Sequence, residues 1–357
     1  MKKILVGMSG GVDSSVAALL LKLNGYEISG CTLKLFDGND INENNLTRTC
    51  CALSDIEDAR SVCFKLNIPH HVFNFKELFH KEVMDRFANG YINGETPNPC
   101  IECNKYIKFD KMLLRARELG FDGIATGHYA KTFYDKKTNR YNLLRPADRK
   151  KDQTYVLYNM TQDQLAHTLF PLWDRDKEAN RNLADEYGLI NSRKPDSQDI
   201  CFVPDGDYVS FIRKHTSKSF SEGDFLDTDG NIIGKHQGII NYTIGQRKGL
   251  GIAFGKPMFV CEKDIINNTI TLGDSNSLMT SVCTADNVNL ISIPKIDGKM
   301  RITAKTRYNM ADTPAILEQV GDSLIRVHFD TPQRAVTKGQ ALVIYDGDIV
   351  VGGGKII

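Results

Sequence analysis

A glycine pair, an aspartate and several serines separate a short apolar run from a leucine-rich run near the start of the chain. The stretch reads Gly7-Met8-Ser9-Gly10-Gly11-Val12-Asp13-Ser14. Adjacent glycines between a parallel strand and a helix let several backbone N–H groups point at one anion, and the helix N-terminus adds partial positive charge. Asp13 is a poor neighbour for a bare phosphate, but it suits a phosphate that arrives with Mg²⁺. Because the stretch lacks both the P-loop lysine and the dinucleotide-binding spacing, it predicts a phosphate site of another kind.

Cysteines are the second group of residues that could do chemistry. The motif Cys100-x-x-Cys103 could supply half of a zinc site, but a second pair with suitable spacing is missing, because Cys50 and Cys51 are adjacent. A thioredoxin-type redox motif would have to follow the first strand, a place that the glycine stretch already takes. An iron–sulfur cluster on Cys100, Cys103 and Cys201 stays an open alternative, since three thiolates can leave one iron position exchangeable.

The remaining interpretation is a pair of thiolates that handles sulfur. Cys103 directly precedes a helical pattern over residues 104–119, and a helix N-terminus stabilises a thiolate. Lys105 adds positive charge nearby. Cys201 lies in the stretch KPDSQDICFVP, residues 194–204, whose polar character is unlike a buried strand. We therefore predict that Cys103 and Cys201 act together, while a part for Cys50 and Cys51 in sulfur delivery stays an alternative.

A third feature is local positive charge on a nearly neutral chain. The sequence has 45 Lys and Arg residues against 44 Asp and Glu residues, a formal net charge of +1. Residues 131–151 nevertheless contain eight basic side chains and two acidic ones. Such a segment can contact the phosphates of a nucleic acid, and a solvated basic hairpin is the structural alternative. The basic residues are Lys131, Lys136, Lys137, Arg140, Arg145, Arg149, Lys150 and Lys151.

The elements that would position these residues alternate between strand and helix in the first two hundred residues. Strands are expected at residues 3–6, 28–36, 70–75 and 123–130, and a helix at residues 14–23. Ser54 to Glu57 has the form of a capping box at the start of a second helix, with an apolar stripe at Ile56, Ala59, Cys63 and Leu66. This alternation predicts an α/β fold with a doubly wound parallel sheet.

Two changes in residue composition and periodicity divide the rest of the chain. Residues 222–257 are rich in glycine with little helical periodicity, and from about residue 282 short alternating strands are separated by turn signals. A chain of 357 residues also exceeds one ordinary core. We predict a catalytic domain at residues 1–210, a small central domain at 211–277 and a C-terminal all-β barrel at 278–357.

The apolar runs and the cysteine content of the sequence indicate the cellular compartment. No apolar run approaches the roughly 18 residues that span a bilayer, and the apolar residues behind Lys2 and Lys3 are too few for a secretion signal. We expect a cytoplasmic protein with no membrane partner. In that compartment nine cysteines do not predict a disulfide framework.

Seven sequence motifs that follow one another along the chain say more about its function than the single residues do. The stretches SGGVDS, TPNPCIECNKYIKF, ATGHYA, RKKDQTYVLY, DSQDICFVP and YTIGQRKGLGI and the pair Arg307-Tyr308 follow one another along the chain. In this combination the sequence resembles the bacterial tRNA-specific 2-thiouridylases, members of the PP-loop ATP pyrophosphatases. The family's ATP-pyrophosphatase domain, central domain and C-terminal barrel agree with the division above.

The resemblance implies a reaction. ATP adenylates the C2 oxygen of the wobble uridine, U34, of tRNAs for Lys, Glu and Gln, and persulfide sulfur replaces that oxygen. The products are 2-thiouridine, AMP and pyrophosphate, and an internal disulfide forms as the product leaves. The implied partners are these tRNAs and a donor protein that loads the sulfur, either a sulfur-relay protein or a cysteine desulfurase. ATP and Mg²⁺ are the implied cofactors, and no metal is fixed by the protein alone.

The resemblance also implies roles for single residues. By motif position Cys103 is the nucleophile and Cys201 carries the persulfide. The implied ATP site comprises Gly7, Met8, Ser9, Gly10, Gly11, Val12, Asp13, Ser14, Leu33 and Gly127. The implied target-base and tRNA contacts are Asn98, Pro99, Cys100, His128, Lys151, Asp152, Gln153, Arg307, Tyr308 and Gln340.

One position departs from the family pattern. Many members carry aspartate where this sequence has Cys100, and a thiol does not replace a carboxylate as an acid or base at neutral pH unless its pKa is strongly lowered. Either that base is dispensable or Cys100 takes part in sulfur handling. Two other functions stay open at this point: a different PP-loop adenylating synthetase or amidotransferase, and a non-catalytic ATP-gated tRNA-binding protein.

Overall fold

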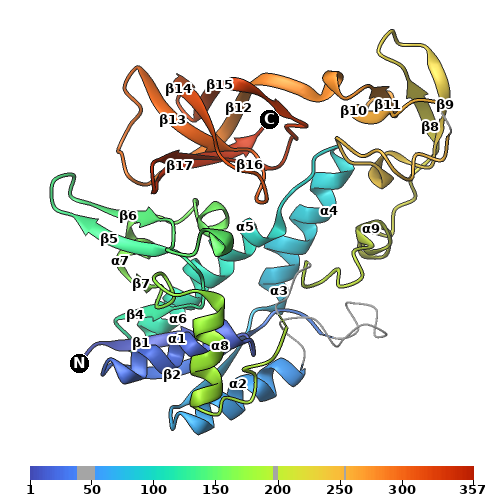
Figure 1. Ribbon diagram of the computed structural model, residues 1–357. Coiled ribbons are helices and arrows are strands. Elements are labelled where there is room, and N and C mark those ends of the chain that lie inside the picture. The colour runs from blue at the N-terminus through green and yellow to red at the C-terminus, as the bar shows by residue number, and fades with distance from the viewer. Residues whose placement is uncertain (38–52, 196–199, 253–254) are drawn as a thin grey trace.

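A five-stranded parallel sheet forms the centre of the N-terminal part of the protein. The computed structural model describes residues 1–37, 53–195, 200–252 and 255–357. The sheet has the strand order β3-β2-β1-β4-β7, so the order reverses beside β1 (Figure 1). Its elements are β1 (Lys3–Gly7), α1 (Val12–Leu23), β2 (Glu27–Lys34), α2 (Leu53–Lys65), β3 (His70–Asn74), β4 (Gly123–Ala125), β7 (Thr168–Leu169) and α8 (Lys177–Glu186). The predicted parallel α/β sheet is confirmed.

Alternate residues of β1 explain why the sheet is covered on both sides. Ile4 and Val6 pack into an apolar cluster with α1, α2 and α8, whereas Leu5 points into a second cluster on the opposite face. A parallel sheet buried on both faces is what crossover helices produce. Ligands of such sheets bind at the carboxyl ends of the strands where the order reverses. Here that point lies beyond β1 and β4.

A long helical stretch connects β3 to β4. It comprises α3 (Lys76–Phe79), the π-helical turn η3 (His80–Met84), α4 (Asp85–Ile92), α5 (Pro99–Cys103), the π-helical turn η4 (Asn104–Lys111) and α6 (Met112–Glu118). The prediction that a helix begins at residue 104 was wrong. Asn98 caps the helix and Pro99 takes its first position, an arrangement that the order Asn-Pro favours.

The predicted capping box was also wrong. Helix α2 already begins at Leu53, so Ser54 lies inside the helix and not at its N-cap. The predicted apolar stripe is confirmed, because Ile56, Ala59, Cys63 and Leu66 are all buried.

Two further sheets follow along the chain. The central part has α9 (Tyr208–Thr216) and a sheet of order β10-β11-β8-β9, built from β8 (Gly223–Leu226), β9 (Ile232–His236), β10 (Phe259–Asp264) and β11 (Thr269–Gly273). The C-terminal part is antiparallel, of order β12-β15-β14-β13-β16-β17, and β12 also pairs with β17. This closure makes the predicted barrel. Its strands are β12 (Met279–Leu290), β13 (Lys299–Lys305), β14 (Thr313–Gly321), β15 (Leu324–Arg334), β16 (Ala341–Asp346) and β17 (Ile349–Ile356).

A hairpin of the N-terminal part extends the barrel sheet. Strands β5 (Lys131–Asp135) and β6 (Arg140–Leu144) pair with each other, and Leu144 pairs with Ile349 of β17. The remaining short elements are η5 (Arg149–Lys151), η6 (Thr154–Val156), α7 (Gln162–Ala166), η7 (Ile239–Asn241) and η8 (Asn276–Leu278).

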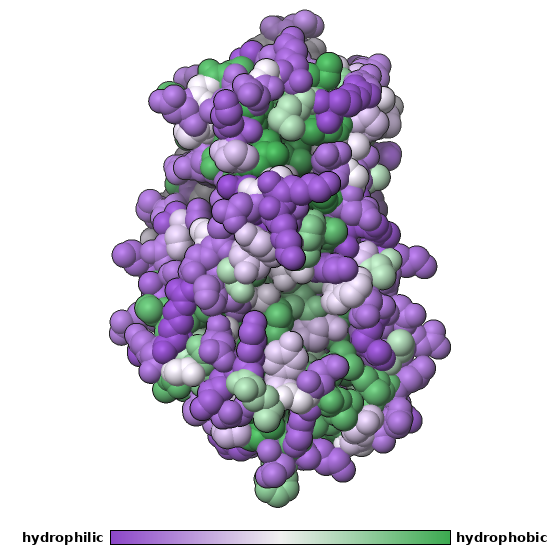
Figure 2. Space-filling view, turned by 90° about the vertical axis from the view of Figure 1, so that its left-hand side faces the viewer, coloured by the Kyte–Doolittle hydropathy of each residue, from purple (hydrophilic) through white to green (hydrophobic). Residues whose placement is uncertain are grey.

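The surface is mostly hydrophilic on the side that carries this hairpin. Figure 2 shows separate hydrophobic patches there, above and below a polar middle. In the part of the chain that the structure describes, no helix is both long and apolar enough to cross a membrane.

Candidate active site

The glycine stretch forms a tight loop between β1 and α1. Gly10 has a φ of +74°, a conformation that favours glycine, and α1 begins two residues later. The Ser14 hydroxyl accepts from the Ser9 backbone N–H at 3.2 Å and donates to the Gly11 carbonyl at 3.0 Å. The loop therefore ends at a helix N-terminus with hydroxyl groups around it, as an anion site requires.

Asp13 is held by side chains from two distant parts of the chain. The Tyr129 hydroxyl donates to Oδ1 at 2.8 Å, and Lys177 Nζ lies 2.8 Å from Oδ2. Asn180 in turn donates to the Tyr129 hydroxyl at 2.9 Å. This fixes the carboxylate at the first turn of α1, beside the anion site. Sequence reasoning missed Tyr129, Lys177 and Asn180, and the position of Tyr129 inside the ATGHYA motif is the one signal that could have found any of them.

Gly127 lies against the loop. A Cβ atom at this position would come within 2.7 Å of the Ser14 backbone nitrogen and 2.8 Å of the Asp13 carbonyl carbon. Only glycine lets the end of β4 approach α1 so closely. The structure thus brings Gly127 to the loop, whereas the predicted Leu33 lies half-buried near the end of β2.

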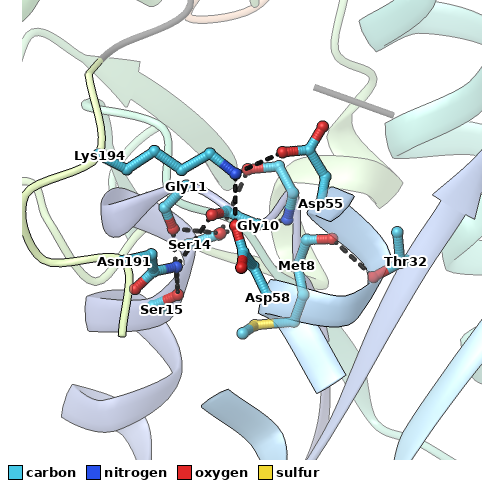
Figure 3. A network of polar contacts seen from close by, with 11 residues as sticks. Met8, Gly10, Gly11, Ser14, Ser15, Thr32, Asp55, Asp58, Asn191 and Lys194 are labelled. Atoms are coloured by element: carbon cyan, nitrogen blue, oxygen red, sulfur yellow. Dashed lines mark hydrogen bonds and ion pairs between the residues drawn. The ribbon is translucent and has the colours of Figure 1, made fainter. Parts of the chain in front are cut away.

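A polar brace ties this loop to the chain segment before Cys201 (Figure 3). Asn191 Nδ2 donates to the Gly10 carbonyl at 3.0 Å and to Ser15 Oγ at 2.8 Å. Lys194 Nζ lies 2.5 Å from Asp55 and 2.6 Å from Asp58 of α2. Burial lowers the pKa of Lys194, but its hydrogen bonds to the two carboxylates outweigh that effect, so the pKa is raised. We call Asn191, Lys194, Asp55 and Asp58 the loop brace.

Asp55 supports the loop by contact as well as by charge. A Cβ atom on Gly10 would lie 2.6 Å from the Asp55 carbonyl oxygen, so the loop rests directly on the first turn of α2. The Thr32 hydroxyl donates to the Met8 carbonyl at 2.9 Å from the other side. None of these supports was predicted, because no pattern in the sequence relates residues 191–194 to the loop.

Cys100 and Cys103 lie on one continuous helical stretch, in different surroundings. The Asn98 side chain accepts from the Cys100 backbone N–H at 3.1 Å, which places Cys100 in the first turn, exposed to solvent. Cys103 lies one turn further and is buried, with 8% of its surface exposed. The predicted placement of Cys103 at a helix N-terminus was therefore wrong, since that place belongs to Cys100.

Cys201 and Cys103 belong to one apolar cluster. Cys103 is a buried member of the cluster, with Phe79, Phe87 and Phe202 among its other members, and Cys201 packs against it while keeping part of its surface exposed. The surroundings are thus less polar than the sequence predicted. Asp196 to Asp199 and the predicted candidates Cys50 and Cys51 lie outside the described residues. Within the described residues, no three His, Cys, Asp or Glu side chains form a group suited to a metal ion.

Tyr308 of the barrel lies near Cys100. Burial raises the pKa of the Tyr308 hydroxyl, and the charges of Asp152 and Cys100 raise it further. Asp152 itself accepts from the Thr154 backbone N–H at 2.9 Å and from its hydroxyl at 2.6 Å. Its carboxylate thus organises the local turn, with 6% of its side chain exposed.

The other predicted tRNA contacts of this region also have internal partners. Gln153 Oε1 accepts from the Tyr129 backbone N–H at 2.9 Å, and Lys151 ends the turn η5. His128 shares a hydrogen bond of 2.8 Å with the Thr126 hydroxyl, and its ring lies 5.7 Å from that of Phe109. Burial, with some repulsion from Lys108, lowers the pKa of His128 well below its usual range. The imidazole is therefore neutral at pH 7.

Two predicted contacts in the barrel also bind within the protein. Arg307 donates to the Ala335 carbonyl at 2.8 Å and to the Thr337 hydroxyl at 2.7 Å, and burial lowers its pKa. Gln340 donates through Nε2 to the Thr96 carbonyl at 2.5 Å. Both side chains therefore hold protein segments in place.

The basic segment is a hairpin, as the structural alternative proposed, and half of its charges attach it to other parts of the chain. Arg140 donates to the Ile291 carbonyl at 2.7 Å, Arg145 lies 3.0 Å from Asp312 and Arg149 lies 2.6 Å from Asp348. Lys131 lies 3.6 Å above the centre of the Trp173 ring. These four side chains therefore have partners within the protein. Lys136, Lys137 and Lys150 remain exposed on the hairpin and the turn after it.

Three protein-family profiles match the chain in succession. Residues 2–205 match the profile described as a tRNA methyl transferase HUP domain. Residues 209–274 match a tRNA methyl transferase PRC-barrel domain, and residues 280–356 match an aminomethyltransferase beta-barrel domain.

Relatives cover nearly the full length of the chain. The tRNA-specific 2-thiouridylase MnmA of Clostridioides difficile (strain 630) is 54% identical over 355 residues, which are 99% of this chain and 98% of the relative. The protein of the same description from Acetivibrio thermocellus is 53% identical, over 99% of each chain. Among solved structures, a 4-thiouridine synthetase bound to RNA and ATP is similar over 60% of this chain and 50% of its own, with a TM-score of 0.39 and 17% identity.

Proposed function

Because the chain belongs to the family of tRNA-specific 2-thiouridylases, we propose that the residues described above carry out the ATP-dependent exchange of oxygen for sulfur at C2 of a tRNA wobble uridine. The protein is a tRNA sulfurtransferase that uses ATP. The residue roles are our proposal, and they are supported by one observation above the others. Cys103 and Cys201, far apart in the sequence, belong to the same apolar cluster, Cys103 as a buried member and Cys201 as a residue packed against it.

The first half of the reaction belongs to the loop after β1. Its backbone N–H groups and the N-terminus of α1 bind the β- and γ-phosphates, while Gly127 packs directly against Asp13 and Ser14 and helps to fix the loop. Asp13, oriented by Tyr129 and Lys177, is the residue that would hold the Mg²⁺ arriving with ATP. The C2 oxygen of the uridine attacks the α-phosphorus, the bond to the bridging oxygen breaks, and pyrophosphate leaves. The base is then joined to AMP through its C2 oxygen.

The second half belongs to the two cysteines. The terminal sulfur of a persulfide on Cys201 attacks C2, and the C2–O bond breaks with AMP as the leaving group. The Cys103 thiolate then attacks the Cys201 sulfur and releases the sulfur on C2 as 2-thiouridine. A Cys103–Cys201 disulfide is left, and an external thiol must reduce it before the next turnover. Burial of Cys103 keeps its thiol away from solvent before the base arrives.

The finer assignments belong to the same proposal. The substrates are tRNAs for Lys, Glu and Gln, with U34 in a single-stranded loop that costs little to unstack. A sulfur-relay protein or cysteine desulfurase loads Cys201, and the reaction takes place in the cytoplasm. Residues 1–210 form the catalytic domain, 211–277 the central domain and 278–357 the barrel that contacts tRNA.

Peptide mass spectrometry after a single turnover tests the cysteine roles. The protein is loaded with sulfur by a persulfide donor, mixed with tRNA and Mg-ATP, and alkylated without reductant. We expect a cross-linked pair of peptides containing Cys103 and Cys201, in an amount equal to the 2-thiouridine formed. A Cys100–Cys201 pair in its place would transfer the nucleophile role to Cys100.

A further inference from the structure

The segment that leads into helix α5 is held by the C-terminal barrel. The Thr96 backbone N–H donates to the Lys338 carbonyl at 2.8 Å, and the Thr96 carbonyl accepts from Gln340 Nε2 at 2.5 Å. Both backbone groups of one residue are thus paired with the turn before β16. In Figure 1 the barrel lies above the start of α5.

Gly339 lies so close to residues 95–96 that a residue with a side chain does not fit at its position. Its φ is +88°, and a Cβ atom here would lie 2.7 Å from the Glu95 Cβ and 3.1 Å from the Thr96 nitrogen. Any side chain at residue 339 therefore pushes the turn away from residues 95–96, besides straining its own backbone.

An ion pair supports the same contact. Lys355 of β17 lies 2.8 Å from Glu95, and both side chains are partly exposed. Lys355 also acts on Glu102 inside the helical stretch: burial raises the pKa of Glu102, and Lys105, Arg86 and Lys355 oppose that rise. One barrel lysine is thus coupled to carboxylates before and within the helix. We call Gly339, Gln340 and Lys355, with Glu95 and Thr96, the barrel latch.

The chain between the latch and the cysteines is stiff. Pro97 and Pro99 fix their own φ angles and restrict the residues before them, Thr96 and Asn98. Pro97 also packs on α4, since a Cβ atom on Gly90 would lie 2.8 Å from its Cγ. Asn98 in turn caps Cys100 at 3.1 Å. A displacement at Thr96 is therefore passed on to the first turn of α5 and is not absorbed between them.

We propose that the barrel latch is a positioning device for the reaction, in which Gly339 and Lys355 set the place of the start of α5 and hence of Cys100 and Cys103 beside the target base. The barrel then contributes to the chemical step and not to tRNA binding alone. The catalytic part of this inference rests on the proposed function. The positional part does not, because the order of residues 95–103 can be measured without any reaction.

The test substitutes Gly339→Ala and compares it with Gly298→Ala. Gly298 is another turn glycine of the barrel, with a φ of +65° and nothing within 4 Å of a Cβ atom, so it carries the backbone strain without the collision. Hydrogen exchange of the peptide covering residues 95–103 is followed by mass spectrometry. Single-turnover 2-thiouridine formation at saturating tRNA and tRNA Kd are measured in parallel.

For Gly339→Ala we expect faster exchange confined to residues 95–103 and a thiolation rate reduced by about tenfold to a hundredfold, as small misplacements of reacting groups produce. The tRNA Kd stays within about threefold of the wild type, because the phosphate contacts are untouched. Gly298→Ala changes neither quantity. Equal exchange and equal rates in the two variants would overturn the proposal.

Lys355 gives a second test that does not endanger folding. Lys355→Met keeps the aliphatic stem and removes the charge, whereas Lys355→Arg keeps the charge. We expect Lys355→Met to speed hydrogen exchange at residues 95–103 and to slow thiolation. Lys355→Arg should keep both rates close to those of the wild type. Wild-type behaviour of Lys355→Met would count against the latch even if Gly339→Ala failed to fold. Absence of thiolation in the wild type would instead refute the proposed function and leave the exchange data to judge the contact.

Discussion

At the scale of single residues, Cys100 and Cys103 differ in what surrounds them. Cys100 is exposed in the first turn of α5, and its backbone N–H serves the Asn98 cap. Cys103 is buried one turn further, in the cluster that Cys201 joins. Solvent thus reaches the Cys100 thiol, whereas the surrounding cluster shields the Cys103 thiol from it.

Serine substitutions separate the two thiols. We expect Cys103→Ser to reduce 2-thiouridine formation by about a thousandfold or more, because a hydroxyl does not cleave the persulfide adduct. Cys100→Ser should cost only a few-fold, since the Asn98 cap is a backbone interaction that serine keeps. Rates from single-turnover nucleoside analysis decide the matter. A larger loss with Cys100→Ser than with Cys103→Ser would reverse the assignment.

The neutral state of His128 makes stability depend on pH. Its folded pKa lies well below the usual 6.5 because burial disfavours the charged ring. Between these two values the unfolded chain binds the proton and the folded protein does not, so the free energy of unfolding falls as pH falls below about 6.5. Above that pH the ring is neutral in both states, so its titration no longer lowers the free energy of unfolding.

Urea unfolding at several pH values tests this point. Between pH 6.5 and pH 5.5 the wild type should lose up to about 1.4 kcal/mol more than His128→Phe, which keeps an aromatic ring between Phe109 and Phe170. The difference between the two proteins should be constant above pH 7. A difference that does not change with pH would show that the folded histidine titrates normally.

Residue identities near the loop could be predicted, whereas their partners could not. Ser9, Gly10, Gly11 and Asp13 were found because glycine turns at helix starts have a known chemistry. Lys177 and Lys194 come from segments with no local signal. Their roles depend on which helix packs where, and no local pattern in the sequence contains that information.

At the scale of elements, the loop brace joins three pieces of chain around the anion site. It connects the start of α1, the first turn of α2 and residues 191–194 (Figure 3). Asp55 has 6% of its side chain exposed, so removal of Lys194 leaves a buried carboxylate without its cation. The loop rests on that turn through Gly10.

Lys194→Met should therefore loosen the loop. We expect the KM for ATP, measured by pyrophosphate release, to rise about tenfold, with about 1–2 kcal/mol lost from stability because the pair is only partly buried. The matched control is Arg301→Met, which breaks an exposed pair with Asp330 in the barrel. An unchanged KM for ATP in Lys194→Met would show that the loop brace does not support the loop.

Four strands of the parallel sheet could be predicted from apolar runs, and the barrel from alternation with turn signals, while helix starting points could not. The short strand β7, at Thr168–Leu169, was not predicted. The apolar pattern predicts a helix from residue 104, five residues after the true start of α5, because the start is set by the Asn98 cap and Pro99 and not by apolar spacing. The α2 capping box failed for the opposite reason: a matching motif lay inside a helix that began earlier.

At the scale of the whole molecule, the β5–β6 hairpin joins the catalytic part to the barrel. Leu144 pairs with Ile349, and Arg140, Arg145 and Arg149 bind barrel residues. These three arginines therefore join the two parts, whereas Lys136 and Lys137 of the same hairpin are exposed. We propose that these two lysines contact the tRNA backbone and that the arginines serve the fold.

Two double variants with equal loss of charge test this division. Lys136→Gln with Lys137→Gln should lower the slope of log Kd for tRNA against log salt by about 0.7–1.8, the value for one or two phosphate contacts. Arg140→Gln with Arg145→Gln should leave the slope nearly unchanged and lower the unfolding temperature. Salt titrations and thermal unfolding of both variants supply the measurements. The reverse pattern would assign the arginines to RNA.

The order of the three parts was readable from the sequence, but not the contacts between them. Changes of texture near residues 210 and 280 mark where sheet types change. By contrast, the pairing of β6 with β17 and the latch at Thr96 join residues about two hundred positions apart. Such contacts form when folded domains pack together, and local sequence periodicity does not predict that packing.

As a tRNA-specific 2-thiouridylase, this chain should place sulfur at C2 of U34 at the expense of ATP. The most direct measurement is mass spectrometry of nucleosides from an unmodified tRNA-Lys transcript, incubated with the protein, Mg-ATP and a persulfide donor, beside a Cys201→Ser control. We expect 2-thiouridine at U34 that requires ATP and is absent from the control, with pyrophosphate released in both. Pyrophosphate release without any thiolated uridine in the wild type would contradict it, because the loop would then activate a different acceptor.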